Sequence, residues 1–269
     1  MTSVVIIVPV FYRDYLAKTI RSILANDCDI ILVNDSETPL KFDNKRVAIV
    51  DNKRNMGVGI SRNRGVNLAL NKGYDLIGFV DSDSVISRNW RRECEKTLAK
   101  PGILGVSGLA LNPNQSSRIA RVKFVFKDYR RRKGIPFQID CSLFKREAFS
   151  LSNFGKRRIG EDSYFLQKLD RNALVVNEKA ISFHHEVEST RDFFRKEIVG
   201  ALYSLSSHRS VAQSFLLTPL NCFKMLRRWK RHYDYSCAAI IWLIRQIAWN
   251  MAYVIGRISF GPPSEPANS

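Results

Sequence analysis

The stretch LIGFVDSDS, residues 76–84, decides how this chain is expected to fold and where its chemistry lies. Its first five residues, Leu76 to Val80, are apolar throughout, as in a strand that is buried on both faces of a sheet. Two acids, Asp81 and Asp83, follow directly, and the alternation of side chains along an extended backbone points both the same way. The stretch therefore predicts a buried strand that ends in a pair of carboxylates.

The rest of the first 190 residues alternates strand and helix patterns. Apolar runs predict strands at 4–8, 30–33, 46–50, 103–111, 137–144, 173–176 and 180–183, with Pro9 ending the first. Apolar side chains at helical spacing predict helices at 15–24, 57–71, 88–100 and 161–169. This order indicates an α/β fold with a mainly parallel central sheet and helices on both faces. Ligands of such sheets bind beyond the carboxyl ends of the strands, where Asp81 and Asp83 lie.

The composition is that of an ordinary globular protein with an unusual charge. Hydrophobic residues make up 45% of the 269 residues, which suffices for a core and excludes a disordered or collagen-like chain. Lysine and arginine number 43 against 25 acids, a formal net charge of +18. So large an excess predicts an anionic partner: nucleic acid, a phosphorylated substrate or a membrane surface.

Cysteine usage and the N-terminal segment indicate a compartment. The five cysteines are scattered without a Cys-x-x-Cys pair, so they predict neither a zinc cluster nor a disulfide framework. The segment MTSVVIIVPVFYRDYL lacks the basic region and the cleavage site of a secretion signal. We therefore expect a reducing, cytoplasmic location.

The two acids after the central strand are a candidate metal site. Asp81 and Asp83 would repel each other unless a cation lay beside them. Divalent ions such as Mg²⁺ or Mn²⁺ accept carboxylate ligands while also binding phosphates. The alternative interpretation is a loop that carries two solvated acids.

Three further stretches carry candidate functional residues. NMGVG begins at Asn55 and leads to Arg62; the amides at a helix start favour phosphate, and Arg62 could hold a diphosphate through two hydrogen bonds. The pair Glu161-Asp162 opens a predicted helix, either as a helix cap or as a general base. The pair at 184–185, two histidines after a predicted strand, offers imidazole to a transition-type metal or serves a structural role. The alternative interpretation of Arg62 is a surface arginine in a helix whose start is a plain helix cap.

These pieces, in this order, resemble the family-2 glycosyltransferases of GT-A fold. The resemblance covers roughly residues 3 to 190. It runs through VPVFYRDYLAKTIRSIL, the VND turn, NMGVGISRNRG, FVDSDS, LGVSG, SLFKREAF and GEDSYFLQKL, and ends at the two histidines. No single motif is specific, but the ordered set is.

The resemblance implies an inverting transferase that uses a nucleotide-diphosphate sugar, with a UDP-sugar as the expected donor. The residues expected to bind the nucleotide-sugar are Pro9, Phe11, Asp35, Asn55, Arg62 and Asp81. Of these, Asp35 would contact the base or ribose, Pro9 and Phe11 would line that pocket, and Asp81 would touch the ribose or the metal. The family usually has paired acids where this chain has Asn34-Asp35, and often Tyr-Asn where it has Phe11-Tyr12. These departures leave the identity of the donor base open.

The resemblance also assigns the metal and the base. Asp83 and His184 would bind Mn²⁺ or Mg²⁺, with the adjacent His185 as the alternative ligand. Asp162 matches the general base, and Glu161 would lie beside the acceptor. A version of the family without a metal also exists in principle, so metal dependence has to be measured.

The C-terminal part of the chain is expected to be helical and basic, with region 191–262 followed by a disordered tail at 263–269. Residues 191–232 contain nine Lys/Arg and two acids. Residues 237–258 are mostly apolar, but polar side chains form one helical stripe with Arg245 beside it. A central arginine costs roughly 2.5–3.5 kcal/mol in a membrane span. A helix lying in an anionic membrane surface avoids that cost; packing on the catalytic domain, packing on the partner in a homodimer, and a true span stay open.

The expected acceptor is a hydroxyl of a glycan or of a lipid-linked molecule. The basic segment 118–133 could hold a lipid diphosphate, or it could be a solvated loop. Polyprenyl-phosphate sugar synthesis is the alternative enzymatic function. Nucleic-acid binding fits the basic and aromatic segments loosely, but it leaves the ordered acidic motifs unexplained, so we expect no nucleic-acid partner.

Overall fold

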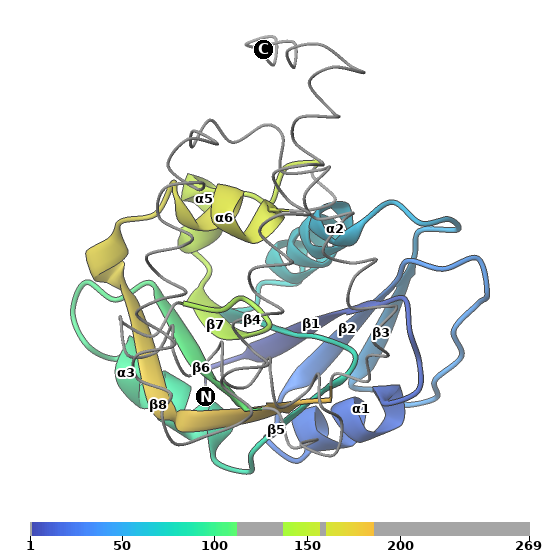
Figure 1. Ribbon diagram of the computed structural model, residues 1–269, viewed down its shortest axis with the longest axis horizontal. Coiled ribbons are helices and arrows are strands. Elements are labelled where there is room, and N and C mark those ends of the chain that lie inside the picture. Colours follow the sequence, from blue (N-terminus) through green and yellow to red (C-terminus); the bar gives the residue numbers. More distant parts are fainter. Residues whose placement is uncertain (1, 112–136, 157–159, 186–269) are drawn as a thin grey trace, which may run out of the picture. The chain divides into compact units, whose positions relative to one another are not determined.

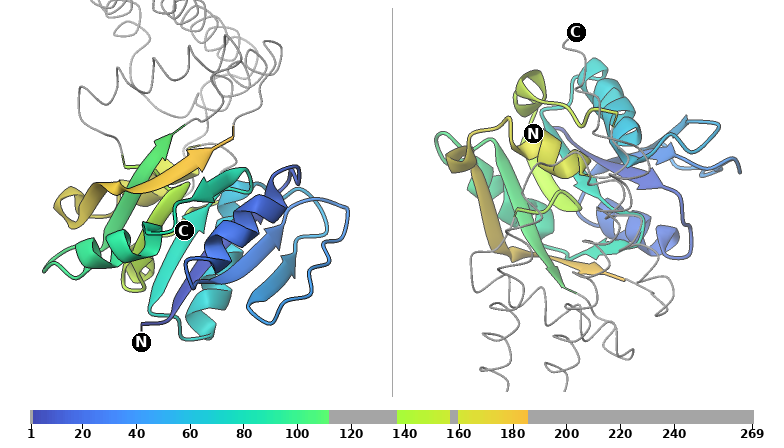
Figure 2. Two further views of the ribbon diagram at one scale, coloured as in Figure 1. Left: turned by 90° about the horizontal axis from the view of Figure 1, so that it is seen from below. Right: turned by 45° about the horizontal axis from the view of Figure 1, so that its top comes forward.

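A computed structural model describes residues 2–111, 137–156 and 160–185 of the chain (Figures 1 and 2). The predicted domain boundary at residue 190 lies outside the described residues. So do the basic segment 118–133, the helical region 191–262 and the tail 263–269. The architecture below is that of the described part.

The described strands form one eight-stranded sheet in the order β3-β2-β1-β4-β7-β6-β8-β5. The strands are β1 (Val4–Val10), β2 (Asp29–Asn34), β3 (Val47–Asp51), β4 (Leu76–Val80), β5 (Ser84–Ile86), β6 (Gly105–Leu111), β7 (Cys141–Lys145) and β8 (Leu174–His184). The helices are α1 (Leu16–Leu24), α2 (Val58–Asn71), α3 (Trp90–Leu98), α5 (Ala148–Leu151) and α6 (Glu161–Leu166), with a 3-10 turn η1 (Arg171–Ala173).

The direction of the strands agrees with the prediction. The part of the sheet from β3 to β4 is parallel throughout, and β6 is parallel to β8. Three pairings are antiparallel, namely β4 with β7, β6 with β7, and β5 with β8. With four parallel pairings against three, the predicted α/β fold with a mainly parallel sheet is confirmed.

Alternate side chains of β1 enter two separate cores. Ile6 and Val8 belong to the core that also contains side chains of α1 and α3. Val5 and Ile7 belong to the other core, with side chains of α2, α5 and α6. Figure 1 shows the same division, with α1 and α3 on one side of the sheet and α2, α5 and α6 on the other. A strand buried on both faces explains why the β1 sequence is apolar without alternation.

The prediction that Pro9 ends the first strand is wrong, because β1 continues to Val10. Val10 O accepts a hydrogen bond from Asp35 N on the β2 side, so the nitrogen of Pro9 faces the opposite side. Pairing with β4 on that side already ends at Ile7 and Phe79. Proline therefore removes no hydrogen bond of the sheet at this position.

The two short strands predicted near residues 173–183 form one strand, β8. The polar residues Asn177 to Lys179 suggested a break, but the pairing with β6 resumes beyond them after a register shift. Gly108 lies at this irregularity, and a Cβ there would stand 2.2 Å from Ala180 O. The Asn177 side chain meanwhile donates to Glu93 O and Thr97 Oγ1 of α3.

The remaining differences are of length. The three-residue β5 and the four-residue α5 were not predicted, because so few residues carry no periodic signal. α6 ends at Leu166 where a helix to residue 169 was expected, and α3 is shorter at both ends than the predicted 88–100. Within the described ranges, none of the helices combines the length and the apolar character that crossing a bilayer requires.

Candidate active site

Four strand ends bring the candidate residues together. Val80, the last residue of β4, pairs with Cys141, the first residue of the antiparallel β7. Ser84, the first residue of β5, pairs with His184, the last residue of β8. The acids next to these pairs are thereby brought to one corner of the sheet. The residues at this corner are Asp81, Asp83, Asp140 and His184.

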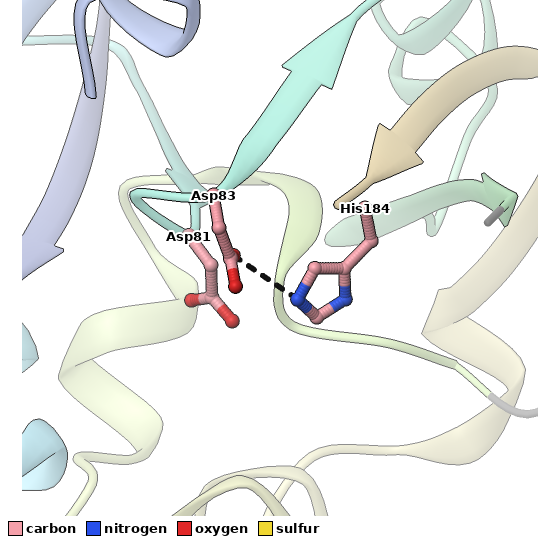
Figure 3. A group of neighbouring side chains, drawn as sticks. All are labelled: Asp81, Asp83 and His184. Carbon is pink, nitrogen blue, oxygen red and sulfur yellow. Dashed lines mark ion pairs between the residues drawn. The ribbon is translucent and has the colours of Figure 1, made fainter. Parts of the chain in front are cut away.

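Three of these side chains could hold one metal ion. Asp81, Asp83 and His184 each offer a ligand atom, and these atoms lie within 4.8 Å of one another. Figure 3 shows the three side chains converging, with His184 Nε2 3.0 Å from Asp83 Oδ1. Two carboxylates and one imidazole are a donor set that suits Mn²⁺, which accepts both oxygen and nitrogen ligands. The residues present therefore fit the divalent ion that the sequence predicted.

The structure separates the two adjacent histidines. His184 takes part in the cluster, whereas the His185 ring stacks on Tyr15 with ring centroids 4.6 Å apart. The backbone N–H of His185 donates to Asp83 O at 2.9 Å. Because neighbouring side chains of a strand point to opposite faces, one of the two histidines has to point away from the cluster.

Sequence reasoning missed Asp140. Its Oδ2 lies 3.5 Å from His184 Nδ1, on the ring side opposite to the one that meets Asp83. A carboxylate in this place orients a metal-binding imidazole. Burial by itself would lower the pKa of His184, but Asp140 and Asp83 together raise it to about 11. An acid before an apolar run was visible in the sequence, but the antiparallel pairing that brings it here was not.

A buried arginine occupies the centre of the site. Arg62 in α2 is 3% exposed, and its guanidinium contacts three carboxylates. Nη1 lies 3.0 Å from Glu161 Oε1 and also pairs with Asp162, and Nη2 lies 3.3 Å from Asp81 Oδ1. The sequence suggested that Arg62 holds a diphosphate; the structure gives it these acidic partners from the chain itself.

Glu161 and Asp162 differ in their access to solvent. The side chain of Glu161 is 10% exposed, and that of Asp162 is 43% exposed. Burial and the neighbouring charge of Asp162 together raise the pKa of Glu161 to about 7, although Arg62 acts in the opposite direction. Burial also raises the pKa of Asp162, again against the effect of Arg62. Of the pair, Asp162 is the one that an incoming molecule can reach.

The pKa of Asp81 reflects its burial and the charges around it. Burial raises the pKa of Asp81 to about 6, and Asp140 acts in the same direction while Arg62 opposes it. A divalent cation would favour the ionised form of such a carboxylate. The excess of acids over bases in this corner is therefore suited to a cation.

Asp35 has a structural task beside the ligand contact expected of it. Its buried carboxylate accepts hydrogen bonds from Asn52 Nδ2 at 2.8 Å, Met56 N at 2.7 Å and Gly57 N at 2.9 Å. These bonds fix the loop that leads into α2, where the exposed Asn55 lies. Gly57 at the start of this helix has φ 93°, a conformation that favours glycine.

The other predicted nucleotide-site residues lie at the carboxyl end of β1. Pro9 is within the strand, and Phe11 follows it with its side chain exposed. The Phe11 ring contacts the exposed Tyr12 edge-to-face, with ring centroids 5.0 Å apart. Pro9 pairs with Val33 of β2, so these aromatic residues and Asp35 lie at the same edge of the sheet.

Comparison with known proteins agrees with this architecture. Residues 5–150, more than half of the chain, match the sequence profile of glycosyl transferase family 2. The chain therefore belongs to this family, and it is a glycosyltransferase with a GT-A fold. No curated protein gives a significant match to the sequence.

Solved structures with the same fold are distant in sequence. Glucosyl-3-phosphoglycerate synthase from Mycobacterium tuberculosis, in complex with Mn²⁺, UDP and phosphoglyceric acid, superposes with a TM-score of 0.51 at 14% identity, over 76% of this chain and 78% of that one. Residues 1–349 of TarS from S. aureus, in complex with UDP-GlcNAc, superpose with a TM-score of 0.53 at 14% identity, over 96% of this chain and 91% of that one.

Proposed function

We propose that this glycosyltransferase moves a sugar from a UDP-sugar to an acceptor hydroxyl, with inversion at the anomeric carbon, with Mn²⁺ or Mg²⁺ as cofactor and with Asp162 as the general base. The observation that carries the proposal is the corner of the sheet in which a metal-fitting cluster and the Glu161-Asp162 pair share one arginine. Structures of the same fold contain Mn²⁺ with UDP, or UDP-GlcNAc, which supports the choice of donor.

The donor is proposed to lie along the carboxyl ends of β1, β2 and β4. Phe11 offers a ring surface for the base, and the loop held by Asp35 borders the ribose. Asp81, Asp83 and His184 would hold the divalent ion, which when bound neutralises negative charge on the departing diphosphate. Asp140 keeps the His184 ring turned toward the cluster.

The chemical step assigns one proton and two bonds. Asp162 accepts the proton of the acceptor hydroxyl while the hydroxyl oxygen of the acceptor forms the new bond to the anomeric carbon. The bond from that carbon to the diphosphate oxygen breaks, and UDP leaves with the bonding electron pair. Attack from the face opposite to the leaving group gives inversion in one displacement. Asp162 suits this role because it is the more exposed acid of its pair.

The acceptor is proposed to be a glycan or a lipid-linked molecule at the cytoplasmic face of a membrane. The support is the sequence, in which a run with nine Lys/Arg and two acids at 191–232 precedes a mostly apolar stretch. A polyprenyl phosphate is the competing acceptor. An acceptor series containing glycans, lipid-linked sugars and polyprenyl phosphate distinguishes the two by which one gains the sugar.

The experiment is a nucleotide-sugar panel on the full-length protein. Diphosphate release and thermal shift are measured for UDP-, GDP- and dTDP-sugars, with Mn²⁺, with Mg²⁺ and with chelator. We expect one UDP-sugar to be turned over, with loss on chelation and recovery on adding metal. Asp83→Asn should lose metal-dependent turnover. The matched control Asp170→Asn should keep it, because Asp170 caps η1 and does not belong to the metal-fitting cluster. Folded protein that turns over no sugar nucleotide with any acceptor would contradict the proposal.

A further inference from the structure

We infer that Arg62 is a positioning residue that ties the general base to the metal-binding strand end, an inference that rests on the function proposed above. It contacts Asp81 on one side and the pair Glu161-Asp162 on the other. These contacts span about 100 residues of sequence, since Arg62 and Asp162 are 100 positions apart. One guanidinium therefore sets the distance between the two halves of the reaction centre.

The burial of Arg62 shows that its ion pairs with the carboxylates are part of the folded structure. A guanidinium removed from water is stable only when carboxylates and other acceptors replace its hydration. Arg62 is 3% exposed, and its guanidinium carbon lies over two neighbouring aromatic rings, at 5.4 Å from the centroid of Phe154 and 6.0 Å from that of Phe79. The two rings help to exclude water from the guanidinium, and the carboxylates accept hydrogen bonds from its Nη groups.

The helix that carries the base depends on outside contacts. α6 has only six residues, and so short a helix is not stable alone. Phe165 anchors its inner face by stacking on Phe154 at 4.5 Å between ring centroids. Arg62 holds its first turn through Glu161 and Asp162. Without Arg62, the turn that contains the base would lose its only described ion pairs.

The neighbouring residue of α2 holds the segment before α6. Asn63 Nδ2 donates to Gly155 O at 2.9 Å, and Asn63 Oδ1 accepts from Phe154 N at 2.9 Å. α2 itself packs closely on β1. Because Gly65 has no side chain, the helix backbone approaches Ile7 so closely that a Cβ would not fit between them. A rigid helix thus positions both the segment before the base and the base itself.

The shape of the side chain explains why arginine is needed. Its planar fork presents several N–H groups at fixed angles, so that Nη1 meets Glu161 and Asp162 while Nη2 meets Asp81. A lysine ammonium is a single point of charge and cannot reach both sides in this geometry. Both Nη atoms of Arg62 contact carboxylates, which argues against the diphosphate as its main partner, whereas its buried Nε has no hydrogen-bond partner among the described residues.

The test compares Arg62→Lys with the matched control Arg91→Lys in the full-length protein. Arg91 is also partly buried and paired, with Glu95 and Asp27, but it lies in α3 away from the site. We expect Arg62→Lys to lower kcat for the UDP-sugar at least 30-fold while KM for the donor and the Kd of UDP with Mn²⁺ change less than threefold. Arg91→Lys should keep kcat within twofold.

A double-mutant cycle with Asp162→Asn separates positioning from general loss of structure. If Arg62 acts through the base, adding Arg62→Lys to Asp162→Asn should cost less than threefold further in kcat. Full multiplication of the two effects would overturn the inference. So would an unchanged kcat in Arg62→Lys, or a loss confined to donor KM and UDP binding, which would assign the residue to the diphosphate.

A second measurement does not depend on Arg62→Lys folding. Hydrogen exchange of the α6 amides should speed up at least fivefold in Asp162→Asn, which removes a partner of Arg62. It should not change in Asp83→Asn, which removes a metal ligand that Arg62 does not contact. Equal exchange in both variants would refute the inference. Failure of the wild-type protein to turn over any sugar nucleotide would instead refute the proposed function, whatever the exchange shows.

Discussion

Replacing Gly65 by alanine tests how tightly α2 is held against the sheet. A Cβ at this position would stand 2.5 Å from Ile7 Cγ2, 3.1 Å from Cγ1 and 3.2 Å from Cδ1. All three atoms belong to one fully buried side chain of β1. The helix can therefore accept the methyl group only by moving away from the strand or by forcing Ile7 out of its conformation.

Two opposing terms set the magnitude. Overpacking of a well-packed core costs about 1–3 kcal/mol. Alanine in a helix interior is favoured over glycine by about 1 kcal/mol. We therefore expect Gly65→Ala to lower the free energy of unfolding by up to about 2 kcal/mol, whereas an exposed helical glycine would gain stability from the same change.

The assay is urea denaturation followed by circular dichroism, in a double-mutant cycle with Ile7→Ala. Ile7→Ala removes the three atoms that a Cβ would meet, so Gly65→Ala should become stabilising by about 1 kcal/mol in that background. Asn67→Ala, at an exposed position of the same helix, serves as the control and should not couple to Ile7. Gly65→Ala that stabilises the wild-type background, or that shows no coupling to Ile7→Ala, would refute the packing argument.

Three further outcomes are expected. Asp162→Asn should lower the rate of sugar transfer about 10²–10⁴-fold, the range for a lost general base, while calorimetry finds the affinity for UDP with Mn²⁺ nearly unchanged. Equal losses of transfer and of UDP binding would contradict the assignment of Asp162 as the base. Burial raises the pKa of Cys28 to about 12, so at pH 8 it is a protonated thiol. In a variant with serine at positions 222 and 237, the remaining thiols, Cys28, Cys94 and Cys141, should react with a disulfide reagent only after unfolding; rapid reaction of the native protein would contradict their burial. The full chain should float with anionic liposomes at low salt, and no flotation at low or high salt would remove the membrane proposal.

The elements that sequence predicted well are those whose signal is local. The run at β4 has the bounds that its apolar residues indicate, and α2 begins one residue after the predicted start. Failures came where local and tertiary signals differ. Pro9 looked like a strand end because proline lacks an N–H, yet here that nitrogen faces a side where the sheet is no longer paired. The polar residues in the middle of β8 looked like a break because an irregular register was not visible.

The residues of the candidate site likewise fall into those with a local sequence signal and those placed by tertiary structure. The acids after β4 were recognisable because a strand end and two carboxylates occur within nine residues of sequence. Asp140 was missed because its place depends on the antiparallel pairing of β7 with β4. The choice between the two adjacent histidines likewise depends on which face of β8 points toward Asp83.

The sequence by itself determined the family, most of the strands and helices, and the acids at the end of β4, because these depend on short-range patterns of apolar and charged residues. Only the tertiary structure decided what Arg62 contacts. Its side chain was long and charged enough to suit a diphosphate, and nothing near it in sequence indicated otherwise. The partners come from segments 19 and about 100 residues away, and a guanidinium buried beside two phenylalanine rings is not stable without such partners.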